Sequence, residues 1–166
     1  VLLHCVVGFY YLVMATDVQQ NAYVLKQGET DAPKGLKDAL VDANKLQDFH
    51  AAAMKNGRTG NEILKEALDN AWADGLKPSI YTHPLGVHGH AAGPTIGLWD
   101  QQGGVPGRGD YPLYPDTCYA IELNAKKDVP EWDNQEVRMS LEQDAWWTGE
   151  KLVFMAGRQK KLHLVS

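Results

Sequence analysis

Three histidines, His83, His88 and His90, lie within eight residues in the middle of this chain. The segment around them, residues 81–102, is rich in glycine and proline, which break helices. Neutral imidazole is the commonest metal ligand in proteins and the usual acid–base group near neutral pH. The segment therefore predicts a metal-binding or catalytic loop. The alternative is a connecting loop in which the histidines are incidental.

Three acidic residues interrupt segments that otherwise resemble β-strands. Asp17 lies in the phrase ATDVQQ, Glu122 in TCYAIEL and Glu142 in VRMSLEQDAWWT. A carboxylate in a buried strand is costly unless it is paired or binds a metal ion. If these acids converged on His83, their oxygens and the imidazole nitrogen could hold a divalent transition-metal ion and leave room for water. Taken singly, each acid could instead face water at an exposed strand position.

The elements that would position these residues follow from the hydrophobic pattern, which predicts an α+β domain. Residues 1–25 predict a β-hairpin or meander, and apolar residues at helical spacing predict a helix over residues 34–55. The phrase Thr59-Gly60-Asn61-Glu62 has the spacing of a capping box and opens a second helix that ends before Gly75. Further strands are predicted at residues 117–123, 137–148, 151–156 and 161–165. A glycine- and proline-rich loop at residues 103–115 is long enough to cover a site.

Composition and charge narrow the class of protein. The chain has 166 residues, 44% hydrophobic and 22% charged, which is ordinary for one globular domain, so residues 1–166 are treated as one domain. A formal net charge of -5 argues against a nucleic-acid partner. Two cysteines make neither a disulfide framework nor a metal-binding pair. The apolar run at residues 1–15 is too short to cross a membrane and lacks the basic start of a signal peptide, so no membrane partner is expected.

The order and spacing of these residues resemble a known family. The chain is similar, over essentially its whole length, to the pita-bread metallopeptidases, which include methionine aminopeptidase, Xaa-Pro aminopeptidase and prolidase. In that family the ligands follow the order Asp, Asp, His, Glu, Glu, and the ligand histidine stands seven residues before a second histidine that contacts substrate. His83 and His90 reproduce that spacing, and Asp17, Glu122 and Glu142 match the second Asp and the two Glu. The phrase VPEWDNQEVRMSLE looks most like the bacterial Xaa-Pro peptidases.

This resemblance implies a curved antiparallel sheet with helices on its outer face. It also implies a peptidase that cleaves an N-terminal peptide bond, in particular one before proline, with a metal-bound water as the nucleophile. The implied ligands are Asp17, His83, Glu122 and Glu142, around one or two ions of Mn, Co, Zn or Fe. Glu122 would also shuttle the proton, and His90 would stabilise the tetrahedral intermediate. His90 and His88 would contact the peptide substrate, with a plain surface position as the alternative for His88.

Two features depart from the family's pattern. The family's first ligand Asp stands eleven residues before the second, and here that position is Val6. We therefore expect a one-metal centre built from the four remaining ligands. The family's catalytic domain also has helices ahead of the first hairpin, whereas this sequence begins in the hairpin. We expect it to correspond to the C-terminal part of a catalytic domain, with exposed sheet that would favour a homodimer.

Two other functions stay open at this point. A pita-bread domain that has lost one ligand could act as a non-catalytic binding module. A metal-free amidinohydrolase of the creatinase type is a third interpretation, which the presence of the four other ligands opposes. The sequence does not fix the localisation: the cytoplasm is the default, and an exported form stays open.

Overall fold

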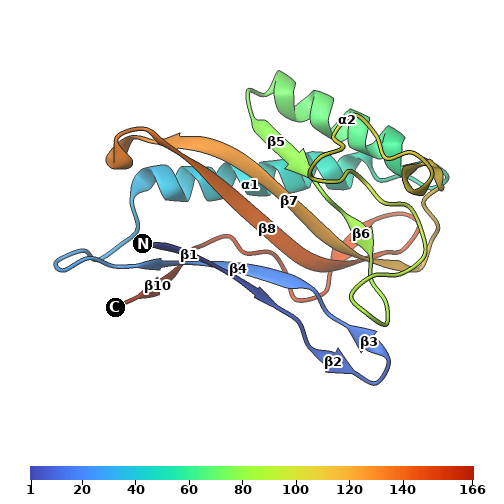
Figure 1. Cartoon of the computed structure of the whole chain (residues 1–166), viewed down its shortest axis with the longest axis horizontal. Coiled ribbons are helices and arrows are strands. Elements are labelled where there is room, and N and C mark those ends of the chain that lie inside the picture. The colour runs from blue at the N-terminus through green and yellow to red at the C-terminus, as the bar shows by residue number, and fades with distance from the viewer.

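The computed structural model describes residues 1–166 and places a curved, mostly antiparallel sheet against two helices (Figure 1). The helices are α1 (Lys34–Ala53) and α2 (Gly60–Ala73). The strands are β1 (Leu2–Val7), β2 (Tyr10–Tyr11), β3 (Met14–Ala15), β4 (Val18–Val24), β5 (Lys77–Ile80), β6 (His83–Pro84), β7 (Thr117–Val129), β8 (Gln135–Trp147), β9 (Leu152–Phe154) and β10 (His163–Val165). Two short 3-10 helices are η1 (Arg108–Asp110) and η2 (Pro130–Trp132). The predicted α+β class, an antiparallel sheet covered by helices, is confirmed.

The main sheet has the strand order β1-β4-β8-β7-β5, and β6, β9 and β10 join it at β7, β8 and β4. Its longest pair is β7 with β8, in register from Thr117↔Trp147 to Val129↔Gln135. β7 continues well beyond the predicted end at residue 123, because Ala125 and Val129 keep the buried face of the strand while polar residues between them obscure the pattern. The two long strands thus form a continuous platform through the middle of the molecule.

Alternation along β7 separates a core face from a second face. Tyr119, Ile121 and Leu123 are fully buried in the hydrophobic core that the strand shares with α1 and α2. Because successive side chains of a strand point to opposite faces, Ala120 and Glu122 lie on the face away from the helices. That second face carries the acidic residues singled out in the sequence.

Both helices form where the apolar periodicity predicts them. α1 ends at Ala53, two residues earlier than expected, and α2 ends before Gly75, whose positive φ of 80° closes the helix. The predicted capping box is present: the Thr59 side chain accepts from Glu62 N, and Glu62 Oε2 accepts from Thr59 N at 2.8 Å. Neither helix offers an apolar stretch of the length that a membrane crossing demands.

The N-terminal segment corrects one expectation about Asp17. β1 pairs with β4, and β2 and β3 form a small separate hairpin between them. Asp17 lies in the connection just before β4, not inside a strand. Its backbone N–H donates to the Asp144 carboxylate, at 3.2 Å to Oδ1, and this bond replaces a partner in the sheet. The tip of the β2–β3 hairpin exposes large apolar side chains. The homodimer expected from such exposed surface stays a prediction.

The long loop at residues 103–115 is held against the start of α2. Asn61 Oδ1 accepts from Val105 N at 2.7 Å, and Asn61 Nδ2 donates to Asp110 Oδ1 at 2.8 Å. Gly109 packs so closely on Asn61 that a Cβ there would lie 2.2 Å from Asn61 Oδ1. The loop is therefore anchored at a defined position rather than free over the surface.

The strand that carries His83 pairs with β7 along one edge, and the segment that contains Gly97 holds the residues before it along the other edge. Thr82 exchanges two backbone hydrogen bonds with Ile96, at 2.9 and 2.8 Å. Gly97 follows with φ of 75°, and a Cβ at this position would lie 2.2 Å from the Ile80 carbonyl oxygen. Both the positive φ and the close backbone approach require glycine here.

We expect Gly97→Ala to destabilise the protein by about 2 kcal/mol or more, because the added methyl group meets backbone that cannot rotate away. Gly103→Ala is the matched control: its Cβ would have nothing within 4 Å, so its effect should stay within about 0.5 kcal/mol. Urea unfolding followed by circular dichroism measures both. Equal stability of the two variants would contradict the role assigned to Gly97.

Candidate metal centre

Two rows of side chains cross the sheet on the face away from the helices. The residues of one row are directly opposite one another in neighbouring strands. The two rows are two residues apart along β7 and β8. Because side chains two residues apart in a strand point to the same face, both rows lie on one face of the sheet. The first row is Glu122, Glu142 and Gln19, and the second is His83, Ala120 and Asp144.

Three of the four predicted ligands meet between these rows. Ligand atoms of Asp17, His83 and Glu142 all lie within 4.8 Å of one another. His83 Nε2 is 3.9 Å from Asp17 Oδ2 and 3.8 Å from Glu142 Oε1. Ala120, which lies between His83 and Asp144 in the second row, offers only a methyl group and so leaves the imidazole room to approach Glu142 on the second strand away.

The orientation of the His83 ring is fixed by its backbone. Its Nδ1 lies 3.1 Å from the Pro84 carbonyl oxygen, so Nδ1 carries the proton and donates it there. That bond leaves Nε2 as the nitrogen that faces the two carboxylates, which is the arrangement of a metal-ligating histidine. Behind the strand, His50 Nε2 lies 2.8 Å from Thr82 Oγ1 and supports the residue that precedes His83.

Glu122, the fourth predicted ligand, lies beside this group but outside it. It is directly opposite Glu142, and its Oε1 accepts from Gln19 Nε2 at 2.8 Å. Burial, followed by the charge of Glu142, raises the pKa of Glu122 to about 7, against the opposing Gln19 hydrogen bond. A carboxyl group with this pKa exchanges protons near neutral pH, which suits acid–base work as well as ligation.

The donor set fits a divalent cation. Among the acids of the cluster, Asp17 and Glu142 are within ion-pair distance of His83, and neither forms an ion pair with a lysine or arginine. Burial and the charge of Glu142 raise the pKa of Asp17. Burial alone would lower the pKa of His83, but the nearby Glu142 carboxylate, the hydrogen bond to the Pro84 carbonyl and the charge of Asp17 outweigh it and raise that pKa. Carboxylates gathered around one imidazole in this way are neutralised by a cation bound through nitrogen and oxygen.

Sequence reasoning missed two residues that border the cluster. Asp144 shares the face of Glu142 and accepts the backbone N–H of Asp17, and burial raises its pKa to about 6. Gln19 binds Glu122, and its own Oε1 is buried without a hydrogen-bond partner. The spacing of Glu142 and Asp144, two residues apart in one strand, was the available signal for Asp144. Nothing in the sequence pointed to Gln19.

His90 lies against the cluster, as its spacing suggested it could. Its ring stacks on the His83 ring with centroids 3.9 Å apart and an angle of 19° between planes. Its Nε2 is 3.2 Å from the Tyr81 hydroxyl. Tyr81 in turn meets Trp99 edge to face, with ring centroids 5.7 Å apart, and the Arg138 guanidinium lies 4.4 Å above the Trp99 ring. A continuous stack therefore holds His90 next to the predicted metal ligand.

His88 is not brought to the site. Its side chain is exposed, and it does not line the pocket that contains His83 and His90.

The pocket that contains His83 and His90 has a volume of about 610 Å³ and is lined mainly by aromatic and small residues. It opens directly beside the cluster and has the size of a small-molecule or short-peptide site. It is lined by Tyr81, His83, Pro84, His90, Ala91, Ala92, Gly93, Thr95, Arg108, Tyr111 and Tyr114.

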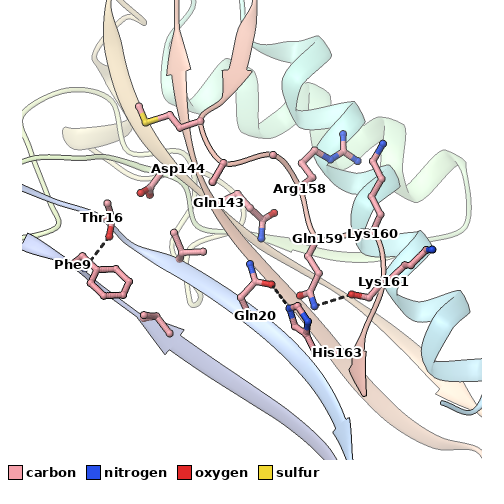
Figure 2. Close-up of a pocket in the computed structure, with 15 residues that line it drawn as sticks. Phe9, Thr16, Gln20, Gln143, Asp144, Arg158, Gln159, Lys160, Lys161 and His163 are labelled. Carbon is pink, nitrogen blue, oxygen red and sulfur yellow. Dashed lines mark hydrogen bonds between the residues drawn. The ribbon is translucent and has the colours of Figure 1, made fainter. Parts of the chain in front are cut away.

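A larger pocket of about 760 Å³ lies elsewhere, between the first strands and the C-terminal segment (Figure 2). Figure 2 shows Asp144 at one end of it and His163, bound to Gln20, at the other. None of the three clustered ligands lines this pocket. The smaller pocket, which does contain His83, is therefore the candidate substrate site.

Val6 occupies the end of the first row. It pairs with Gln19, which pairs with Glu142, so its side chain points to the same face as the acids. It is 62% exposed on the edge strand β1. This is the position at which the resemblance expects a carboxylate, and the hydrocarbon side chain supplies no ligand atom.

Comparison with known proteins supports the fold through structure rather than through sequence. No family model matches the sequence, and no curated protein matches it either. Among solved structures, the chain is similar to an X-Pro aminopeptidase from Thermotoga maritima, with a TM-score of 0.73 and 15% identity over 99% of this chain and 42% of that one. It is similar to an Xaa-Pro dipeptidase from Bacillus anthracis, with a TM-score of 0.69 and 19% identity over 98% of this chain and 41% of that one.

The same fold also occurs in a structure that is not titled as a peptidase. The N-terminal domain of the FACT complex subunit SPT16 from chickpea matches with a TM-score of 0.65 and 14% identity, over 99% of this chain and 38% of that one. The chain thus spans about two fifths of the length of the structures it matches. It has the pita-bread fold of Xaa-Pro aminopeptidases, prolidases and dipeptidases.

We expect the stability of the metal-free protein to fall as pH rises from about 4.5 to 7. In the folded protein Glu122 has a pKa of about 7, against an ordinary value of 4.5, so the folded state binds this proton more tightly than the unfolded state does. This difference stabilises the folded state at low pH, and the stabilisation is lost as the pH rises through about 7. The loss should be about 1–3 kcal/mol, measured by urea unfolding in the presence of a chelator.

Glu122→Gln should flatten this part of the pH profile because the amide does not titrate. Glu150→Gln, which removes an exposed carboxylate in the turn before β9, is the control and should leave the profile unchanged. A profile that is the same in wild type and Glu122→Gln would show that the charge of Glu122 is not the source.

Proposed function

We propose that this chain is a metal-dependent peptidase that hydrolyses an N-terminal peptide bond, with Xaa-Pro as the preferred bond. One observation carries the proposal: ligand atoms of Asp17, His83 and Glu142 lie within 4.8 Å of one another at the edge of a pocket that also contains His90. The structural similarity to peptidases of the pita-bread fold supports the same reaction class.

The chemistry follows from what each residue can do at this position. A divalent ion held by Asp17, His83 and Glu142 would polarise the scissile carbonyl and lower the pKa of the attacking water. Glu122, with a pKa of about 7, would accept a proton at neutral pH and return it to the leaving nitrogen. His90 lies against His83 and would donate a hydrogen bond to the oxyanion of the tetrahedral intermediate. Tyr81, bonded to His90 Nε2, would keep that ring in place.

The preference for proline is supported by the pocket's lining. Tyr81, Tyr111 and Tyr114 offer flat apolar faces, against which a pyrrolidine ring packs well. Two of the similar structures bear Xaa-Pro or X-Pro in their titles. The proposed partner is accordingly a peptide substrate, and a homodimer remains part of the proposal through the exposed apolar hairpin.

We propose a single ion of Mn, Co, Zn or Fe, not a pair. Val6 lies where the resemblance expects the first Asp, and the side chains nearest to it in its row are Gln19 and then Glu142. A second ion would depend on that absent carboxylate, whereas the first does not.

A second candidate function is a non-catalytic binding module with the same fold. The hydrocarbon side chain at Val6 favours it, because one ligand of the family's pattern is missing. The occurrence of this fold in a FACT complex subunit is consistent with it. The two candidates differ in one measurable property, the binding of a divalent ion.

The test is equilibrium binding of Co²⁺ or Mn²⁺ to the purified chain, followed by hydrolysis of alanyl-proline. We expect one ion per chain, and we expect His83→Ala to weaken its affinity by more than about 100-fold, because it removes a ligand rather than a residue that only orients one. His163→Ala, which removes an exposed histidine in the other pocket, is the control and should bind the ion normally.

Binding of less than one ion per chain at saturating metal would overturn the peptidase proposal and favour the binding module. Normal metal binding without hydrolysis of any Xaa-Pro peptide would reject the reaction while leaving the metal centre intact.

Val6→Asp should add a ligand for a second ion. The side chain lies on an exposed edge strand, so the change should cost little stability, and the number of bound ions should rise from one to about two, with faster cleavage. Val7→Asp is the matched control, because the neighbouring residue points to the opposite face and adds the same charge on the side of the sheet away from Glu122 and Glu142. Equal metal content in the two variants would mean that Val6 does not limit the site.

A further inference from the structure

Gln19 carries a buried oxygen atom that has no partner, and this residue lies in the candidate metal centre. It is 6% exposed and stands on β4 directly opposite Glu142. Its amide nitrogen Nε2 donates to Glu122 Oε1 at 2.8 Å, whereas its amide oxygen Oε1 is buried without a hydrogen bond. An acceptor that has left water in this way destabilises the folded state unless a water or an ion pairs with it.

The other buried polar side-chain atoms without a partner lie on the helix side of the sheet. They belong to Gln47 and His50, which are buried on α1, and to Tyr119, which lies in the hydrophobic core on β7. Gln19 shares the face of Glu142, because residues directly opposite one another in a sheet point to the same side. Gln19 Oε1 is therefore the one such atom on the face that carries the acids.

The hydrogen bond to Glu122 fixes where the Gln19 amide lies. In the first row Glu142 on β8 stands between Gln19 on β4 and Glu122 on β7, so the two bonded residues are two strand spacings apart, roughly 10 Å. The Gln19 side chain must therefore extend across Glu142, one of the three clustered ligands. Its backbone is held as well, because its carbonyl oxygen accepts from Gln143 Nε2 at 3.3 Å.

The neighbours of Gln19 in the first row offer Oε1 no hydrogen-bond donor. Glu142 on one side carries carboxylate oxygens, which accept, and Val6 on the other side carries only hydrocarbon. A cation is the partner that suits the amide oxygen and the carboxylate together. Amide carbonyl oxygens are ordinary ligands of divalent cations and combine with carboxylates in oxygen-rich sites.

We propose that Gln19 Oε1 is a further ligand of the divalent ion, beside Asp17, His83 and Glu142. The inference rests on the proposed function for the presence of the ion, and it goes beyond it by assigning a ligand that the order Asp, Asp, His, Glu, Glu does not contain. The carboxylates of Asp17 and Glu142 already balance the two positive charges of the ion. An amide oxygen adds to its coordination without adding charge.

The first test is a double-mutant cycle on the affinity for Mn²⁺, measured by calorimetry. Gln19→Leu, which removes both amide atoms, should weaken binding by about 10- to 100-fold. Because the amide also holds Glu122, the substitution is repeated in a Glu122→Ala background, where the loss of a ligand should cost about the same factor. Gln20→Leu is the matched control: the neighbouring glutamine points to the opposite face and contacts His163, so this variant should bind Mn²⁺ normally.

The second test observes the ligand directly and does not depend on how a variant folds. The chain is synthesised with ¹³C at the side-chain carbonyl of glutamine, and the Mn²⁺-loaded protein is examined by electron–nuclear double resonance. A carbon bonded to a ligating oxygen should show a ¹³C coupling to the ion in wild type. Gln20→Leu should keep this coupling, and Gln19→Leu should abolish it.

Two results would overturn the inference while the proposed function stands. One is a bound ion without ¹³C coupling, which would give Oε1 a water as its partner. The other is a loss of affinity that disappears in the Glu122→Ala background, which would mean that Gln19 only orients Glu122. Mn²⁺ binding with the expected coupling, but without hydrolysis of alanyl-proline, would uphold the ligand and reject the peptidase. A wild-type chain that binds no ion would overturn both.

Discussion

The register of β7 against β8 is the constraint on which the candidate site depends. It sets Glu122 directly opposite Glu142 on the face away from the helices, where both carboxylates are largely buried. Like charges directly opposite in a sheet repel each other, and burial increases the cost. Burial first, and this repulsion second, raise the pKa of Glu122 to about 7. The opposite face of the same strands forms the hydrophobic core, so the pair cannot move apart without disrupting that core.

The remaining ligands reach this pair by two different routes. His83 arrives on a two-residue strand that is held from one side by Ala120 and from the other by the Thr82–Ile96 bridge. Asp17 arrives on an irregular connection that is tied down by the Asp144 carboxylate. His83, held by strand pairing, and Asp17, held by a side-chain hydrogen bond, thus meet at Glu142. The cluster combines residues from both ends of the chain, and its geometry depends on the entire sheet being formed.

The fold by itself does not decide between catalysis and binding. Structures with this fold include X-Pro aminopeptidases and a FACT complex subunit, at similarly low sequence identity to this chain. What favours a peptidase is local: an imidazole with its free nitrogen facing two carboxylates, a second imidazole stacked on it, and a pocket beside both. What opposes it is equally local, the hydrocarbon side chain of Val6 at the end of the acidic row. Function in this fold is a property of a few side chains on a shared framework.

The sequence by itself determined the features that depend on near neighbours. Helical periodicity and the Thr59–Glu62 capping box predicted both helices, and the spacing of His83 and His90 marked the segment that lies at the site. It could not give the position of Asp17 outside a strand, or the contacts that Asp144 and Gln19 make with the acids of the site. Only the tertiary structure decided these, because Asp17 and Asp144 are 127 residues apart and meet through strand register. A one-residue change in that register would turn the acids to the other face, and no local pattern encodes it.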